Sequence, residues 1–326
     1  MNASTSSTDS RRLWHHIPQL PVQLTPWFDW PPRPAASLKW LLSLWRPVGL
    51  YTGCVALAAV IYFGFQPETA VMQTFSASWI FQIWIRNLIL LSAVAGALHL
   101  YLYTFKKQKN NLKFEEKDPS RNSKTHSFGN QTLDNMFWSL GSGVTIWTAY
   151  ESVYYWAGAN SYIPVLSFTE NPLWFVLMFF VISVWSSFHF YWVHRFLHWP
   201  PLYKVAHALH HRNVNIGPWS GISMHPVEHL IYFSSFAIHF VVASHPLHFL
   251  YHAYFQGIGP SLSHSGYEEL QVQGKNRMAL GVFFHQLHHK FFKCNYGTVE
   301  MPWDRWFGSF HDGTEEATRR IRKRRW

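Results

Sequence analysis

Long apolar stretches separated by polar segments form the main pattern of this chain. Four of them carry few or no charges and have roughly the twenty-residue length that a helix needs to cross a bilayer. They span residues 47–66, 79–105, 135–158 and 173–193. Arg86, near one end of the second stretch, is expected to extend its side chain toward the membrane surface. The pattern predicts an all-α polytopic membrane protein with about four transmembrane helices.

A fifth apolar stretch, residues 230–262, is interrupted by Ser244-His245-Pro246. Two full crossings would need roughly forty residues, and this stretch has 33. A single crossing would place the histidine-rich segments before and after it on opposite sides of the bilayer. We therefore expect a re-entrant helical hairpin that turns at Pro246, with the histidine-rich segments forming a helical cap on one face.

The distribution of charge predicts which face that is. Basic residues concentrate in the loop 106–124, at Arg11 and Arg12, and in the tail 319–325. Positively charged loops beside membrane spans stay on the cytoplasmic side. Two spans lie between Arg11/Arg12 and the loop 106–124, so both of these basic segments are expected on the same side. The net charge of +10 is therefore interpreted as attraction to a membrane surface, with no nucleic acid partner.

These boundaries divide the chain into four parts. Residues 1–46 are a polar N-terminal segment, and 47–134 hold the first transmembrane pair and the basic loop. Residues 135–311 hold the third and fourth spans with the histidine-rich segments, and 312–326 are a basic tail. Only two cysteines occur, which argues against a disulfide-stabilised scaffold.

Histidines recur at spacings of three or four residues, which place side chains on one face of a helix. The groups are His194/His198, His207/His210/His211, His225/His229 and His285/His288/His289, with His264 alone. Neutral imidazole binds Fe, Zn, Cu and Ni, and packing several desolvated imidazoles together without a ligand is unfavourable. So many ligands exceed the three or four that one zinc site uses, so two metal ions are expected. Isolated histidines such as His99, His239, His245 and His248 are interpreted as hydrogen-bonded polar groups. His252 is intermediate between such a group and a metal ligand.

The motifs HxxxH at His194, HxxHH at His207 and HxxHH at His285 resemble the histidine boxes of the fatty acid hydroxylase/sterol desaturase superfamily. The resemblance extends over residues 135–311, and Asn295-Tyr-Gly with Trp303-Asp-Arg is similar to the sterol C-5 desaturases. It implies a catalytic domain with two Fe ions, ligated by the box histidines and completed by His225, His229 and His264. It also implies O₂ as co-substrate and boxes that face the cytoplasm, in an endoplasmic reticulum or bacterial inner membrane.

The function that follows is desaturation or hydroxylation of a sterol or fatty acyl C–H bond in a membrane lipid. Electrons must come from an external donor, cytochrome b5-like or ferredoxin-type, because the chain has no flavin, haem or Fe–S motif. The alternative is a membrane metal-ion carrier, although transport sites lie near the bilayer midplane and these histidines follow span ends. The lipid, the carbon and the choice among desaturation, hydroxylation and ether cleavage stay open.

One position departs from the family pattern. Many members carry an acidic residue seven positions before the first box histidine, and this chain has Ser187 there. A ligand histidine usually donates its second N–H to a carboxylate or carbonyl. Glu228, Glu268 and Asp304 are the candidates to replace that acidic residue.

Overall fold

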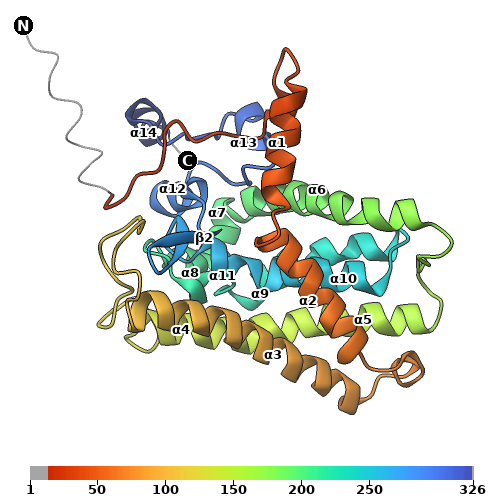
Figure 1. Cartoon of the computed structure of the whole chain (residues 1–326). Coiled ribbons are helices and arrows are strands. Elements are labelled where there is room, and N and C mark those ends of the chain that lie inside the picture. The colour runs from red at the N-terminus through yellow and green to blue at the C-terminus, as the bar shows by residue number, and fades with distance from the viewer. Residues whose placement is uncertain (1–13, 325–326) are drawn as a thin grey trace, which may run out of the picture.

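A computed structural model describes residues 14–324 of the chain, most of which are helical (Figure 1). The long helices are α2 (Leu50–Gly64), α3 (Ala77–His99), α5 (Val144–Ala159), α6 (Pro172–Leu197) and α10 (Pro246–Gly257). Helix α3 continues through the π-helical turn η4 (Leu100–Thr104). Helix α4 (Gln131–Trp138) runs into α5 through a second π-helical turn, η5 (Ser139–Gly143). Arg11, Arg12 and Arg325, part of the charge pattern above, lie outside the described residues.

Helix α10 is the centre of the bundle. It contacts α2, α5 and α6, while α3 packs along α5 (Figure 1). Most of its residues are buried, because apolar and aromatic side chains such as Phe249, Leu250 and Tyr254 point to every side. A helix that is apolar all round belongs in an interior, so α10 supports the elements that carry the histidines.

All four apolar stretches form helices. Two of them, Ala77–Thr104 and Pro172–Leu197, are long and apolar enough to cross a membrane, and α2 is apolar but shorter. In the fifth stretch, α9 (Pro226–Phe233) and η8 (Ser234–Phe240) precede a turn, and α10 begins at Pro246. Proline is favoured in the first turn of a helix, where its missing N–H costs nothing. The number of spans and the membrane position of this hairpin stay predictions.

Arg86 does not extend to a membrane surface. It is 9% exposed and pairs with Glu151, which is fully buried. Asn87 donates to the second carboxylate oxygen of Glu151 at 3.0 Å and to Thr148 at 3.2 Å. A buried charge needs a partner, and α5 supplies it, so the ion pair fixes α3 against α5.

One sheet interrupts the helical pattern of the described residues. Strands β1 (Glu269–Val272) and β2 (Lys275–Ala279) pair antiparallel. They are joined by Gln273 and Gly274, which both have positive φ, as the tight hairpin turns that fit a twisted sheet require. The prediction of an all-helical chain missed this hairpin. It lies between the histidine elements and contacts the loop 105–130, where Gln108 bonds the backbone of Glu269 and Gln271.

The shorter elements lie near the histidines or along the surface. They are η2 (Pro26–Phe28), α1 (Pro34–Leu44), η3 (Thr69–Gln73), α7 (Pro200–Leu202), η6 (Tyr203–His207), α8 (Ala208–His211), η7 (Pro218–Ser220), α11 (Gly259–Ser263), α12 (Phe283–Phe291), α13 (Trp303–Trp306) and α14 (Glu315–Arg322). The N-terminal segment crosses this end of the molecule, since Thr25 donates its N–H to the Val299 carbonyl and Trp14 packs on Phe283.

Candidate metal centre

Histidine-bearing elements meet at one end of the bundle. The last turn of α6, the η6–α8 segment, the end of α11 and helix α12 all lie there (Figure 1). The structure brings nine of the eleven candidate histidines into two adjoining groups, each buried. Within each group, the candidate ligand atoms lie within 4.8 Å of one another.

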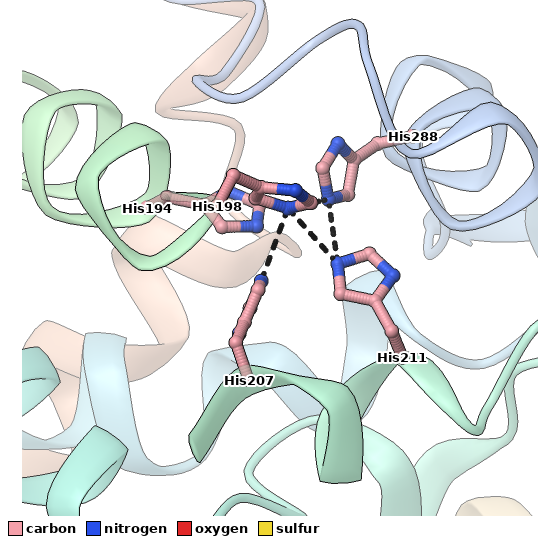
Figure 2. A group of neighbouring side chains, drawn as sticks. All are labelled: His194, His198, His207, His211 and His288. Carbon is pink, nitrogen blue, oxygen red and sulfur yellow. Dashed lines mark hydrogen bonds between the residues drawn. The ribbon is translucent and has the colours of Figure 1, made fainter. Parts of the chain in front are cut away.

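The first group contains five histidines from three elements: His194, His198, His207, His211 and His288. Figure 2 shows their rings converging from α6, from the η6–α8 segment and from α12. The Nε2 atom of His198 lies 3.1 Å from those of His207 and His211 and 3.2 Å from that of His288. Two ligands at right angles, each about 2.1 Å from a metal ion, have nitrogens about 3 Å apart. The spacing therefore fits ligands of one ion.

The second group contains four histidines, His210, His264, His285 and His289. The Nε2 atoms of His264 and His285 are 3.0 Å apart, and those of His285 and His289 are 3.1 Å apart. The two groups adjoin, because His211 packs on His289 with ring centroids 5.0 Å apart. This arrangement can hold a second ion beside the first.

Each HxxHH motif contributes to both groups. His207 and His211 enter the first group and His210 the second, whereas His285 and His289 enter the second and His288 the first. Residues i and i+4 of a helix point about 40° apart, and residue i+3 lies about 100° from i+4. The middle histidine of each motif therefore faces a different group from the outer pair.

The second ring nitrogen of several candidate ligands already has a hydrogen-bond partner. Nδ1 of His194, His207 and His288 lies at 2.7, 2.7 and 2.6 Å from the Tyr296 carbonyl, a Glu228 carboxylate oxygen and the Cys294 carbonyl. These acceptors require Nδ1–H, so Nε2 of a neutral ring carries a lone pair. Two such lone pairs repel each other at 3 Å unless a cation lies between them, so these residues fit a metal ion.

Burial keeps the rings in the form that binds metal. Desolvation lowers the pKa of His207, His211, His285 and His289, and the neighbouring imidazoles lower it further. The pKa of His210 falls to about 4, again chiefly through burial. Metal ligation requires neutral imidazole, and these groups are neutral at neutral pH.

His225 and His229 do not enter either group, although the family resemblance implied that they complete the shell. Nδ1 of His225 caps α9 by accepting the N–H of Val227. Both nitrogens of His229 face other partners, Nε2 the Ile222 carbonyl at 2.9 Å and Nδ1 the Ser142 hydroxyl at 3.2 Å. The i, i+4 spacing of His225 and His229 is suitable for metal ligands, but at the start of α9 both rings bond to other partners.

The isolated histidines have hydrogen-bond partners of the kind expected for satisfied polar groups. His239 bonds Ser244 and His252, and His252 also bonds Ser186 and Ser235. His248 donates to the Phe175 carbonyl. None of these three belongs to a metal-ligand group.

Asp304 and Glu228 support the first group in different ways. Glu228 contacts His207 directly. Asp304 accepts the N–H groups of Tyr296 and Gly297 at 2.9 and 2.7 Å, and so fixes the carbonyl that accepts from His194. Glu268 instead pairs with His16, and Ser187 bonds Thr298 at 2.8 Å. The carbonyl of Tyr296 is therefore the second partner of His194 that could not be identified from the sequence.

A cavity of about 180 Å³ adjoins both groups. Its wall includes His194 and His207 of the first group and His210, His264 and His285 of the second. Along α6 it is lined from Ser183 to Leu197, about 21 Å of helix. Phe190, Val193, Leu197 and Phe255 make much of the wall apolar. An elongated apolar ligand can reach the histidines by this route.

The chain is similar to proteins of one family. The fatty acid hydroxylase family profile matches residues 175–309. A Delta(7)-sterol 5(6)-desaturase of Eremothecium gossypii is 30% identical over 142 residues, covering 43% of this chain and 38% of that protein. The Candida glabrata protein of the same name is 34% identical over 37% of this chain and 32% of its own length. A Nicotiana tabacum Delta(7)-sterol-C5(6)-desaturase is 27% identical, over 45% of this chain and 54% of its own length.

The chain thus spans less than half of the two fungal relatives and about half of the plant one. No solved structure shows a significant match. The matched segment contains all nine converging histidines as well as Tyr296 and Asp304. The residues of the candidate metal centre therefore lie in the segment that is similar to the fatty acid hydroxylase family.

Proposed function

We propose that this protein is a membrane-bound non-haem di-iron oxidase that uses O₂ and external electrons to desaturate or hydroxylate a lipid C–H bond. One observation carries the proposal: two adjoining groups of buried histidines face a single cavity with an apolar wall. The two groups supply nitrogen ligands for two ions, and the cavity supplies a route for a lipid. The fungal and plant relatives named above support a lipid as substrate.

The residues of the site have two roles: some would bind the iron ions, and others orient those ligands. His194, His198, His207, His211 and His288 would hold one iron, and His210, His264, His285 and His289 the other. Bound iron supplies the redox chemistry that activates O₂ toward an unactivated C–H bond. Glu228 and the Tyr296 carbonyl keep Nδ1 of their histidines protonated and so direct Nε2 at the ion. This orientation precedes metal binding and lowers its cost.

The apolar wall excludes water from the reacting carbon. Phe190 lies against His194, with ring centroids 4.9 Å apart, and 6.4 Å from His285. It therefore covers the cavity side of both groups. A lipid held in the cavity beside Phe190 would expose one segment of its carbon skeleton to the histidines and shield the rest, as a selective oxidation requires.

The membrane setting forms part of the same proposal. The helices Ala77–Thr104 and Pro172–Leu197 would cross the bilayer, and His194 at the end of the second would lie at the cytoplasmic boundary. The basic loop 106–124 and tail agree with that orientation. An electron donor of the cytochrome b5 or ferredoxin type would approach from the same side.

Metal content and lipid turnover test this proposal together. The purified full chain is expected to contain two irons and to convert a lipid only when O₂ and a reductant are supplied. Lipid mass spectrometry of cells with and without the protein then identifies the product. Zinc in both groups with metal uptake into vesicles and no O₂ consumption would instead indicate a metal carrier.

A further inference from the structure

A shallow groove runs along the outer face of α6 near its C-terminal end. The side chains that line it are Trp192, Arg195, Phe196 and Trp199. Their spacing of three and four residues places them on one side of this helical end, opposite the side that faces the cavity and the histidines. The three aromatic residues are 41%, 54% and 56% exposed. Neighbouring exposed apolar side chains of this size indicate a surface that contacts another molecule.

Arg195 gives the groove a positive charge that no carboxylate of the described chain balances. None of the ion pairs within residues 14–324 includes it. Its Nη1 donates to the Tyr191 hydroxyl, and the guanidinium carbon lies 5.8 and 5.9 Å from the ring centroids of Tyr191 and Tyr296. These contacts fix the position of the guanidinium group. It has five N–H donors, and the Tyr191 hydroxyl uses one of them, so others are available to a ligand.

The groove lies where α6 would leave the bilayer. Pro172–Leu197 is one of the two helices that are long and apolar enough to cross a membrane, and the groove follows its last turns. Tryptophan concentrates at the membrane–water boundary, and Trp192 and Trp199 lie on either side of Arg195 in the chain. The molecules next to this face are therefore expected to be lipid headgroups.

One cation beside apolar surface fits a phosphate that is attached to acyl chains. A guanidinium group binds two phosphate oxygens at once, and the aromatic rings can contact the first methylene groups. No Asp or Glu lines the groove, so a choline or ethanolamine group would place a second cation beside Arg195 without a counter-charge. A headgroup with a net negative charge avoids this cost. An acidic protein presents several carboxylates and is matched by several cations, whereas this groove has one.

We propose that this groove binds an anionic phospholipid, with Arg195 holding the phosphate and the three aromatic side chains lying against the acyl chains. The inference rests on the membrane setting that forms part of the proposed function, but not on iron or on turnover. Arg195 also lies against Tyr296, whose carbonyl accepts from His194. A bound phospholipid would therefore stabilise the surface next to the first histidine group.

Photolabelling of the purified full chain in detergent micelles tests the inference. The probe is a phosphatidylglycerol with a diazirine near the start of one acyl chain, and the readout is labelling of residues 192–199 by peptide mass spectrometry. Unlabelled phosphatidylglycerol is expected to compete about five-fold more effectively than phosphatidylcholine, equivalent to about 1 kcal/mol, which is typical for one basic residue at an anionic lipid surface. Inorganic phosphate and poly-glutamate are expected not to compete.

Arg195→Gln is expected to abolish the five-fold preference, so that both lipids compete equally. Arg305→Gln is the matched control, because Arg305 is exposed and lies over the Phe310 ring but pairs with Asp29 outside the groove. The wild type provides a second measurement if Arg195→Gln fails to fold. Its preference should fall toward equality as the salt concentration rises from about 0.1 M to 1 M, since the screening length shortens from about 10 Å to 3 Å.

A preference that persists in folded Arg195→Gln, or that does not change with salt in the wild type, would overturn the inference. Effective competition by inorganic phosphate would indicate a site for free phosphate, and competition by poly-glutamate alone would indicate an acidic protein partner; either result would also overturn it. Iron content of the same preparations tests the proposed function separately. A chain that binds phosphatidylglycerol at Arg195 but takes up no iron would contradict the oxidase and leave this lipid site intact.

Discussion

The backbone carbonyl of Tyr296 accepts a hydrogen bond of 2.7 Å from Nδ1 of His194. Asp304 fixes this carbonyl, because its carboxylate accepts the N–H groups of Tyr296 and Gly297 and the hydroxyl of Ser309. A backbone carbonyl thus performs the role that a carboxylate has in many metal sites. The carboxylate of Asp304 would lie one hydrogen bond further from a bound ion.

Asp304→Asn is expected to lower the metal affinity of the first group by 10- to 100-fold. An amide can accept only through one atom, so at least one of the two backbone N–H groups loses its partner and the Tyr296 carbonyl shifts. Metal titration monitored by absorbance measures the change. Glu268→Gln is the control, since Glu268 pairs with His16 away from both groups. Equal losses in the two variants would contradict this role for Asp304.

Ser187→Asp introduces the acidic residue that many family members have at this position. We expect it to lower metal occupancy or stability, because His194 already has the Tyr296 carbonyl and Ser187 is buried against Thr298. A carboxylate placed there would be an uncompensated buried charge. Metal analysis and thermal unfolding measure both effects. Higher iron occupancy in this variant would show that His194 lacks an adequate second partner.

His288 and His229 form a matched pair for testing the ligand assignment. Both are fully buried, but only His288 has its Nε2 within 3.0 Å of another ligand nitrogen, that of His211. His288→Ala is expected to abolish iron binding to the first group and to abolish activity. His229→Ala is expected to retain two irons and to lose about 1–3 kcal/mol of stability, from the unpaired Ile222 carbonyl. Iron analysis of both folded variants decides the assignment.

The sequence predicted the helices and the histidine boxes because each depends only on residues that are close together in the chain. Apolar runs of sufficient length form helices in any context that buries them, and the i, i+3, i+4 spacing of a histidine motif is a property of one helix. The distribution of each HxxHH motif over two groups follows from that spacing as well. The same reasoning included His225 and His229, whose spacing is equally good.

What the sequence did not show depends on contacts between distant segments. Arg86 meets Glu151 only because α3 and α5 pack side by side. The second partner of His194 is a backbone carbonyl 102 residues away, and a carbonyl carries no side-chain signature. The β1–β2 hairpin had a local signal in Gln273-Gly274, but its strands are only four and five residues long.

The Arg86–Glu151 pair predicts non-additive effects on stability. Glu151→Gln leaves a buried guanidinium group without a counter-charge and is expected to cost about 3–5 kcal/mol. Arg86→Met combined with Glu151→Leu removes both charges and is expected to regain most of that loss. Thermal unfolding in detergent, for Arg86→Met, for Glu151→Leu and for the double variant, measures the coupling. A double variant as unstable as the sum of the singles would show that the pair is not coupled.

The metal-free protein is expected to lose stability as the pH falls below about 6.5. In the unfolded chain a histidine has a pKa near 6.5, whereas burial lowers the pKa of His210 to about 4 and that of the surrounding histidines in the same direction. Between those values the unfolded state binds more protons, so acid favours unfolding. Each such group contributes a slope of about 1.4 kcal/mol per pH unit. The unfolding temperature of the metal-free chain should therefore decline steeply from pH 6.5 to 4.5.

Bound metal should shift this acid transition to lower pH, because the ion competes with protons for the same nitrogens. The stabilisation by iron, measured as the difference in unfolding temperature between loaded and metal-free protein, is expected to be largest near pH 7 and to shrink toward pH 4.5. His229→Ala, which retains the ligands, should follow the same curve. An unfolding temperature that is constant from pH 7 to 5 would mean that these histidines take up protons as readily in the folded chain as in the unfolded one.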